Sequence, residues 1–364
     1  MLKVGILGGG QLGRMLLQAA ANYPVETSVM ENDADCPAAH LCHHFVYTFG
    51  KGLDALTIEI ESVNDDALAA LEAEGVKIYP RTPALRIIKN KIEQKQFYAA
   101  HSIPSANFVI TQSLRDLEQH TDFFPGVHKL ASGGYDGRGV QIIASAQDAG
   151  KGFDAPAVLE KKVNIHKEIA QIVAVNEAGQ TTLYPPVDMV FDPELNLLDY
   201  QVSPAELTET ILWKVEAIAL KVVKALASPG IFAVELFIDK VGEVFVNETA
   251  PRVHNSGHHT IEGNYSSQFD MLWRIILGYP LGNTAAILPA AIVNMLGEEN
   301  YSGVAQYDGL EDVLQMDNVF VHIYGKKETR PGRKMGHVTI LSADRKDLTY
   351  KQSRIRDVLK VVSG

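Results

Sequence analysis

Two glutamates lie inside apolar segments that read as neighbouring strands: Glu235 in IFAVELFI and Glu248 in VFVNETA. Antiparallel pairing about a turn at Val241-Gly242 would place the two side chains opposite each other, although Val-Gly is not a preferred hairpin dipeptide. Facing carboxylates repel each other, and burial raises the pKa of one of them, whereas a bound Mg²⁺ removes both problems. We therefore predict a metal site at Glu235 and Glu248. The alternative is that one of the two glutamates faces solvent.

A dense run of hydrogen-bond donors, PRVHNSGH, follows the second of these strands. Arg252, His254 and Asn255 are residue types that hold a small anion and stabilise developing negative charge. A single histidine at a strand end would more often be structural. The combination of three donor types favours a catalytic site.

A first glycine-rich segment has the pattern Gly8-x-Gly10-x-x-Gly13 after a strand-like run, and Glu31 comes 18 residues after Gly13. This matches the fingerprint of dinucleotide sites, in which glycines admit a pyrophosphate and the acid binds a ribose hydroxyl. Amides at a helix N-terminus bind any anion. Another phosphate ligand and a tight structural turn therefore remain alternatives.

A second segment, SGGYDGRG, has four glycines in eight residues. Such a segment has few side chains to pack, so we expect a mobile flap whose amides, with Arg138, wrap phosphates. Lys129, just upstream on a predicted strand, would add a cation. A flexible surface hairpin is the alternative. The candidate nucleotide-binding residues of this segment are Ser132, Gly133, Gly134, Tyr135, Asp136, Gly137, Arg138 and Gly139.

A third segment, near the C-terminus, holds five cations in the nine residues 326–334 of an acidic chain. Arginine contacts a phosphate through two donors and lysine offers a point charge, so the segment predicts a clamp for a substrate phosphate. A solvated basic loop is the alternative. Cys36, His40 and Cys42 lie close together in the sequence, but their spacing matches no common zinc pattern.

Alternating short strands and helices must position the first of these segments. Strand-like runs and helical patterns alternate up to residue 88, which indicates an α/β domain with a parallel sheet covered on both faces. A basic helix over residues 89–100 follows. Ser203-Pro204-Ala205-Glu206 matches a helix start, and we expect that helix to run from Ser203 to about Ala227. From about residue 285 the chain mixes short strands with a final helix.

Composition limits the class of protein. The chain of 364 residues suits two or three domains, and 46% apolar residues are enough for a large core. Lys and Arg number 33 against 44 Asp and Glu, and this net charge of −11 disfavours nucleic-acid binding. No run approaches the roughly 18 apolar residues of a membrane span, and the N-terminus reads as a strand, so we expect a cytoplasmic protein without a membrane partner. Two cysteines do not make a disulfide framework.

Five motifs together resemble the ATP-grasp superfamily, and more closely its 5-(carboxyamino)imidazole ribonucleotide synthase family. They are GGGQLGRM, the EIE at Glu59–Glu61, SGGYDGRG, NETAPRVHNSGH and RPGRKMGH, in that family's order and across almost the whole chain. The resemblance implies an N-terminal doubly wound parallel sheet over residues 1–88, a two-lobed α+β ATP-grasp domain over 89–284 and a small β-rich domain over 285–364. It also implies a homodimer.

The resemblance further implies the chemistry. ATP would phosphorylate bicarbonate to carboxyphosphate. The exocyclic amine of 5-aminoimidazole ribonucleotide would capture that species, or the CO₂ that it releases, leaving ADP and phosphate. The substrates are then small molecules, and ATP and Mg²⁺ are required without a nicotinamide.

The resemblance assigns residues to each ligand. It implies Mg²⁺ at Glu235 and Glu248, and catalytic roles for Arg252, His254, Asn255 and Asp136. Contacts with ATP are implied at the SGGYDGRG residues and at Lys91, Lys129, Glu160, Lys161, Lys162, Val163, Glu168, Asn247 and Glu248. Contacts with the ribonucleotide are implied at Gln11, Leu12, Glu59, Tyr135, Asp136, Lys326, Arg333 and Lys334.

Some positions depart from the family pattern. Ala250 stands where many ATP-grasp enzymes carry a third metal ligand, so two carboxylates are expected. Lys91 stands where relatives often have arginine, and EKKVNIHKE is more basic than expected for an adenine-binding strand. The nearest alternative is a formate-dependent glycinamide ribonucleotide transformylase. A non-catalytic nucleotide sensor and a NAD-linked oxidoreductase are alternatives from other classes.

Overall fold

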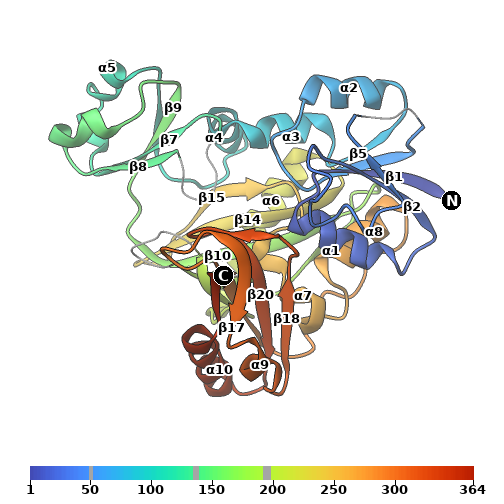
Figure 1. The fold of residues 1–364 in the computed structure, drawn as a ribbon. Helices are drawn as coiled ribbons and strands as arrows, with labels where there is room; N and C mark the ends of the chain where they lie inside the picture. Colours follow the sequence, from blue (N-terminus) through green and yellow to red (C-terminus); the bar gives the residue numbers. More distant parts are fainter. Residues whose placement is uncertain (49–51, 134–138, 192–197) are drawn as a thin grey trace.

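The computed structural model describes residues 1–48, 52–133, 139–191 and 198–364. Figure 1 shows an N-terminal α/β layer, a large central sheet with the C-terminal strands, and a small lobe of strands β6 to β9 that stands apart from the central sheet. No helix in these four ranges is both long and apolar enough to span a membrane.

The N-terminal layer is a parallel sheet in the order β3-β2-β1-β4-β5. Helix α1 covers one face through a cluster with Val4 and Leu16, while α2 and α3 cover the other face through a cluster with Leu56 and Leu85. Helices on both faces of a parallel sheet confirm the predicted doubly wound arrangement. The elements are β1 (Leu2–Leu7), α1 (Gln11–Ala20), β2 (Val25–Met30), β3 (His44–Val46), β4 (Ala55–Ile58), α2 (Asp65–Ala73), β5 (Lys77–Tyr79) and α3 (Thr82–Lys89).

The small lobe is an antiparallel sheet in the order β6-β9-β7-β8, and helix α4 joins it to the N-terminal layer. Asn90 separates α3 from α4 because its side chain accepts hydrogen bonds from the amides of Ile92 and Glu93 and so caps α4. The helix predicted over residues 89–100 therefore begins at Lys91. The elements are α4 (Lys91–Ala100), β6 (Phe108–Thr111), α5 (Leu114–Leu117), β7 (Gly126–Leu130), β8 (Val140–Ile143) and β9 (Ala157–Lys161).

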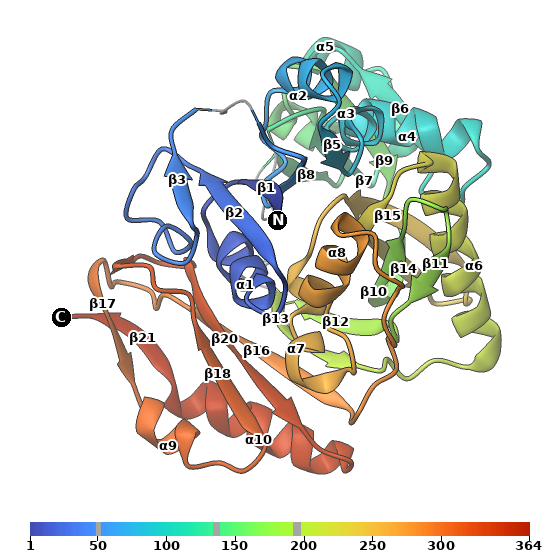
Figure 2. The same ribbon diagram turned by 90° about the vertical axis from the view of Figure 1, so that its right-hand side faces the viewer.

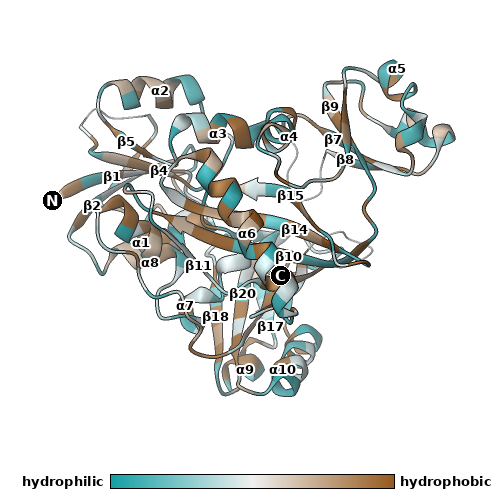
Figure 3. Ribbon diagram, turned by 180° about the vertical axis from the view of Figure 1, so that it is seen from behind, coloured by the Kyte–Doolittle hydropathy of each residue, from teal (hydrophilic) through white to brown (hydrophobic). Residues whose placement is uncertain are grey.

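The central sheet runs in the order β15-β14-β10-β12-β13-β16-β20-β18, with β11 paired to β10. Helix α6 covers one face through Val215 and Val222, and α8 covers the other through Phe269 and Leu272. Figure 3 shows hydrophobic residues along strands such as β14 and mostly hydrophilic ones on the peripheral helix α10. The elements are β10 (Ile165–Val175), β11 (Thr181–Leu183), β12 (Val187–Phe191), β13 (Leu198–Ser203), α6 (Glu209–Leu226), β14 (Gly230–Asp239), β15 (Val244–Ala250), α7 (Thr260–Gly263), α8 (Gln268–Ile276) and β16 (Ala290–Leu296).

The C-terminal part is built onto this same sheet, because β16, β20 and β18 extend it beyond β13. Strands β19, β17 and β21 form a separate antiparallel sheet beside them. The elements are β17 (Gly303–Asp308), α9 (Leu310–Leu314), β18 (Val319–Ile323), β19 (Glu328–Thr329), β20 (Lys334–Leu341), α10 (Arg345–Val358) and β21 (Lys360–Ser363).

The helix predicted to begin at Ser203 begins at Glu209 instead, so that prediction was wrong. Ser203 is the last residue of β13, and its backbone pairs with Ala290 of β16. The helix is capped by Thr208, whose hydroxyl accepts a hydrogen bond from the amide of Ile211 at 3.4 Å. The local capping pattern was overruled because strand pairing holds Ser203 in an extended conformation.

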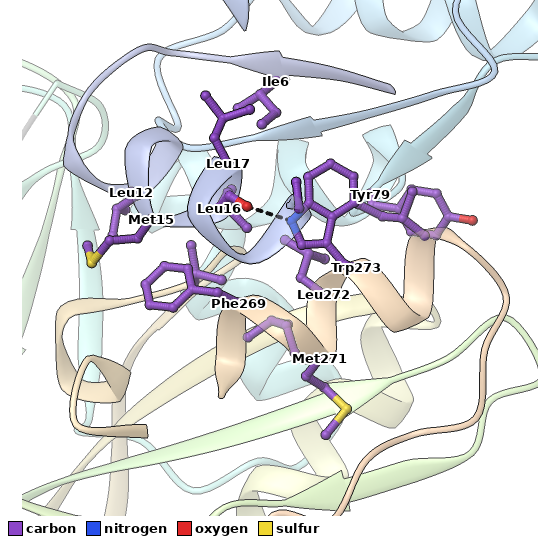
Figure 4. Packing of buried hydrophobic residues seen from close by; sticks show 14 of the residues in the cluster. Ile6, Leu12, Met15, Leu16, Leu17, Tyr79, Phe269, Met271, Leu272 and Trp273 are labelled. Carbon is purple, nitrogen blue, oxygen red and sulfur yellow. Dashed lines mark hydrogen bonds between the residues drawn. The ribbon is translucent and has the colours of Figure 1, made fainter. Parts of the chain in front are cut away.

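The packing of α1 against α8 fixes the N-terminal layer to the central sheet. Trp273 of α8 is fully buried, and its indole Nε1 donates a hydrogen bond to the carbonyl oxygen of Leu16 at 2.7 Å (Figure 4). Leu12, Met15 and Phe269 belong to the same buried cluster. Figure 2 shows α1 lying between α8 and the C-terminal strands.

Candidate functional site

The two glutamates are direct partners in the central sheet, as predicted: Glu235 of β14 pairs with Glu248 of β15. Glu168 lies on the same face, on β10, where it pairs with Phe237 two residues beyond Glu235. This face is opposite to the one covered by α6, whose partners on β14 are Val234 and Leu236. Three carboxylates therefore gather on one face of the sheet.

The turn and the strand pairing that produce this register differ from the predicted hairpin. Asp239 and Glu243 pair across a three-residue loop, with the amide of Asp239 donating to the carbonyl of Glu243 at 3.0 Å and Gly242 at φ +84°. Carried along a regular ladder, this turn would put Asn247 opposite Glu235. A β-bulge between Glu235 and Leu236 leaves Asn247 unpaired and moves Glu248 into register. Two deviations from a simple hairpin thus cancel.

Each carboxylate of the pair has a different electrostatic environment. Burial, and then the neighbouring charge of Glu248, raise the pKa of Glu235. The Lys91 ammonium, which pairs with Glu248, holds the pKa of Glu248 well below its ordinary value. His254 Nε2 lies 3.7 Å from Glu235 Oε1. A divalent cation suits this arrangement, because Glu235 is a buried acid whose ionised form needs a positive partner.

Lys129 connects the small lobe to the bulge. Its Nζ donates to Asn247 Oδ1 at 2.9 Å and lies 3.1 Å from Glu160 Oε1 on β9. Lys95 of α4 approaches the same oxygen of Glu160 to 3.2 Å. Burial by itself would raise the pKa of Glu160, but the charges of Lys129 and Lys95 outweigh it, so this pKa is lowered. Burial raises the pKa of Glu168 to about 7, against a smaller opposing effect of the charge of Lys129.

The segment expected to contact adenine begins at Glu160, near the end of β9. The side chain of Glu160 turns to the two lysines rather than to an open site. The amide of Lys161 donates to the carbonyl of Asn107 at 2.8 Å, and that of Lys162 donates to the carbonyl of Pro125 at 3.1 Å. Adenine contacts by Val163 and by the carbonyls of this segment stay predictions.

The donor run after β15 forms a compact cluster. Arg252 Nη2 lies 3.1 Å from Glu61 Oε1, and the main chain of His254 is held by Gln268, whose Oε1 accepts from the His254 amide at 2.9 Å. Arg252 Nε and both side-chain polar atoms of Asn255 are buried without a hydrogen-bond partner among the described residues. Unpaired buried donors are costly, and a small anion would accept hydrogen bonds from Arg252 Nε and Asn255 Nδ2.

The first glycine segment is filled by the protein's own acids. Glu59 accepts hydrogen bonds from the amides of Gly10 and Gly13, both at 3.0 Å, and Glu31 accepts one from Gly9 at 3.1 Å. A Cβ on Gly10 would lie 2.7 Å from Glu59 Oε1, so the glycine is needed for this close approach. Because these amides already bind carboxylates, the dinucleotide interpretation of the segment is not supported.

Four other residues predicted to hold the ribonucleotide are Gln11, Leu12, Lys326 and Arg333. Gln11 begins α1 and is half-buried, whereas the side chain of Leu12 packs in the core. Lys326 Nζ donates to the carbonyl of Lys334 at 2.7 Å, and Arg333 Nη1 donates to that of Glu328 at 2.7 Å.

The basic segment also reaches the N-terminal layer. Lys327 pairs with Asp35 at 2.8 Å, and a Cβ on Gly325 would lie 3.5 Å from Arg14 Nη1. These contacts bring two of the predicted substrate-binding segments, distant in the sequence, side by side.

Part of the second glycine segment lies outside the described residues, namely the predicted ligands Gly134, Tyr135, Asp136, Gly137 and Arg138. Its described ends belong to a hairpin: the amide of Leu130 donates to the carbonyl of Gly139 at 2.9 Å. Ala131, beside Ser132, accepts a hydrogen bond from the amide of Lys91 at 2.8 Å. The segment therefore starts next to the first residue of α4.

Sequence reasoning missed two charged residues of this region, Glu61 and Lys95. Glu61 lies within the EIE motif, but the motif by itself does not indicate its function. Its ion-pair partner, Arg252, is far away in the sequence. The spacing of Lys91 and Lys95 was a usable signal, because residues four apart lie on one helix face. Within the described ranges, no group of three or more His, Cys, Asp or Glu side chains is arranged to hold a metal.

Three family models match successive parts of the chain. Residues 1–89 match the model of the ribonucleotide synthetase preATP-grasp domain, and residues 96–269 match that of the ATP-grasp domain. Residues 290–351 match the model of the phosphoribosylaminoimidazole carboxylase C-terminal domain.

Similar proteins cover the whole chain. A chloroplastic phosphoribosylaminoimidazole carboxylase of Vigna aconitifolia is 38% identical over 93% of the chain, which spans 64% of that protein's length. The crystal structure of N5-carboxyaminoimidazole ribonucleotide synthetase from Thermotoga maritima is 38% identical, with a TM-score of 0.91 over 100% of both chains. A structure of the Aspergillus clavatus synthase in complex with ADP and 5-aminoimidazole ribonucleotide is 29% identical, with a TM-score of 0.88 over 98% of each chain. The chain thus belongs to the N5-carboxyaminoimidazole ribonucleotide synthase family of ATP-grasp ligases.

Proposed function

We propose that the carboxylate pair, the lysines beside it and the donor run after β15 form one active site. As a member of its family the chain is an ATP-dependent carbon–nitrogen ligase of purine biosynthesis. It joins bicarbonate to the exocyclic amine of 5-aminoimidazole ribonucleotide, with ADP and phosphate as the other products. The observation that carries the assignment of this site is the register of Glu235 and Glu248, with Lys91 and Lys129 beside them.

Glu235 and Glu248 are the proposed Mg²⁺ ligands. The bound ion would neutralise charge on the nucleotide's terminal phosphates. Glu248 is kept ionised by Lys91, so it is ready to bind a cation. Asn247 is fixed between this pair and Lys129 and keeps the bulge in place.

Lys91 and Lys129 are the proposed partners of the ATP phosphates, together with the SGGYDGRG segment. Phosphoryl transfer to bicarbonate brings two anions together, so cations at the terminal phosphate must offset their repulsion. Lys129 comes from the small lobe and contacts Asn247, and Lys91 comes from α4 and pairs with Glu248. The pocket for adenine and ribose would include residues 160–163 and Glu168.

Arg252, His254 and Asn255 are the proposed bicarbonate and carboxyphosphate ligands. Arg252 Nε and Asn255 Nδ2, which have no hydrogen-bond partner in the described part of the chain, are donors of the kind that an oxyanion requires. Glu61 and Gln268 hold Arg252 and His254 in place. The ribonucleotide would lie between Gln11, Leu12 and Glu59 and the cations Lys326, Arg333 and Lys334, with Tyr135 and Asp136 closing the site.

The proposed division of labour follows the expected domains: residues 1–88 bind the ribonucleotide, 89–284 bind MgATP, and 285–364 hold the substrate phosphate. We further propose a homodimer that acts in the cytoplasm, where ATP and purine precursors are available. Its partners would be small molecules, and neither nucleic acid nor a membrane.

ADP release tests the proposal directly. We expect release with 5-aminoimidazole ribonucleotide and bicarbonate together, and much less when either is omitted. Formate with glycinamide ribonucleotide should give no stimulation. Stimulation by formate would favour the transformylase alternative, and ATP binding without stimulated hydrolysis would favour the nucleotide sensor.

A further inference from the structure

We propose that Lys95 is a positioning residue that shares the charge of Glu160 and so leaves the charge of Lys129 available to the nucleotide. The proposal rests on the proposed role of Lys129 and adds to it a residue that contacts no substrate.

The geometry places one acid between two ammonium groups. Glu160 Oε1 lies 3.1 Å from Lys129 Nζ and 3.2 Å from Lys95 Nζ. All three groups are almost withdrawn from solvent, because the side chains of Lys95 and Glu160 are 3% and 5% exposed and that of Lys129 is 10% exposed. The Nζ of Lys129 donates a hydrogen bond of 2.9 Å to Asn247 Oδ1, which is the oxygen of a neutral amide.

The balance of charge decides what Lys129 can offer. With two lysines to one carboxylate, the buried group carries a net positive charge facing the metal ligands. Without Lys95, Glu160 and Lys129 would form a neutral pair. In a medium of low dielectric constant this pair would be tightly held. Lys129 would then be drawn toward Glu160, and its field at the phosphates would be largely cancelled.

Several features indicate that Lys95 acts through its charge rather than through packing. Its Nζ is buried and makes no hydrogen bond of good geometry within the described part of the chain. Burial lowers the pKa of Lys95 to about 8, while Glu160 acts in the opposite direction, so the group is still charged at neutral pH. An apolar residue of similar size would fill the space at less desolvation cost.

Lys91 and Lys95 lie on one face of helix α4. Lys91 and Lys95 are one turn apart, and they pair with Glu248 and Glu160 respectively. Lys91 thus pairs with the proposed metal ligand Glu248. Lys95 pairs with Glu160, the acid that also contacts Lys129. This arrangement explains why two lysines at this spacing point into the interior.

The test uses Lys95→Met and the double variant Lys95→Met/Glu160→Gln. Lys95→Met should raise KM for ATP about tenfold or more and leave KM for 5-aminoimidazole ribonucleotide near its wild-type value. The double variant removes the acid as well, so the charge of Lys129 is no longer neutralised, and KM for ATP should fall clearly below that of Lys95→Met. Lys95→Arg, which keeps the charge, should stay close to wild type.

Lys89→Met is the matched control, because it removes a lysine that pairs with Asp65 at 2.5 Å on a neighbouring helix. It should leave KM for ATP unchanged. If Lys95→Met does not fold, Lys95→Gln with its own double variant takes its place, and ADP binding by calorimetry supplies the affinity.

Two results would overturn the proposal: an unchanged KM for ATP in Lys95→Met, or a double variant no better than the single one. Failure of the underlying function looks different. Wild-type nucleotide affinity in Lys129→Met would remove Lys129 from the phosphate site, whatever Lys95 does.

Discussion

Each charged residue at the proposed active site has its own electrostatic surroundings. Lys91 lowers the pKa of Glu248, whereas Glu235 is left as a buried acid with a raised pKa. On the other side of the cluster Glu61 is the partner of Arg252, at 3.1 Å. Single substitutions here should therefore act through charge, with effects specific to the ligand that each group faces.

Replacing Glu248 by Gln should lower ATP turnover about 10²-fold or more. The amide keeps the shape of the side chain but loses the negative charge that balances a divalent cation. Steady-state ADP release at saturating substrates measures the effect. Glu243→Gln is the control, because this exposed acid of the same hairpin pairs with Lys214 away from the site. Turnover close to wild type in Glu248→Gln would refute the metal-binding role.

Replacing Glu61 by Gln should raise KM for bicarbonate about tenfold with little change in KM for ATP. Arg252 would lose its charged partner and its fixed orientation, and the anion that it holds would bind more weakly. Initial rates at varied bicarbonate and at varied ATP separate the two constants. Equal changes in both would show that Glu61 supports the fold in general and not Arg252 in particular.

At the scale of elements, strand register and helix packing bring these groups together. The bulge at Asn247 sets Glu248 opposite Glu235, and α4 presents two lysines to the same cluster. The contact of α1 with α8 then joins the N-terminal layer to the central sheet. That contact depends on Trp273 of α8, whose indole packs in the cluster with Leu16 of α1 and donates a hydrogen bond to the Leu16 carbonyl.

Trp273→Phe should lower the free energy of unfolding by about 1–3 kcal/mol, because the indole volume and its hydrogen bond to Leu16 are both lost. Denaturant or thermal unfolding measures the change. Trp213→Phe is the control: Trp213 is 68% exposed, so its replacement should stay within about 0.5 kcal/mol of wild type. Equal losses in the two variants would contradict the role assigned to the α1–α8 contact.

At the scale of the whole molecule, buried histidines mark the junction between the C-terminal strands and the segment after β15. The rings of His258 and His337 are 4.8 Å apart, and His337 stacks on His322 at 4.4 Å. Burial lowers the pKa values of His258, His259 and His337, so all three are neutral at pH 7. Acid should therefore destabilise this junction, because protonation of the buried histidines favours unfolding.

The free energy of unfolding should fall as the pH falls from 7 to 5. The unfolded chain binds protons at these histidines below about pH 6.5, whereas the folded chain resists them, so acid favours unfolding. With its pKa lowered to about 4, His259 alone would contribute about 2 kcal/mol over this interval.

Thermal unfolding at several pH values measures this slope. His259→Gln should make it shallower, while His166→Gln, at an exposed position, should leave it unchanged. A slope that is the same in all three proteins would contradict the assignment to the buried histidine.

The sequence by itself determined the features that rest on local pattern. Alternating short strands and helices indicated the doubly wound N-terminal sheet, and the apolar runs around Glu235 and Glu248 indicated two adjacent strands. Only the tertiary structure decided that β16, β18 and β20 extend the central sheet, that Ser203 ends a strand, and that Glu59 fills the glycine loop. The contact of Glu160 with both Lys95 and Lys129 was likewise decided only by the tertiary structure. These outcomes depend on contacts between residues far apart in the chain. The free energy of such contacts cannot be read from a local sequence pattern.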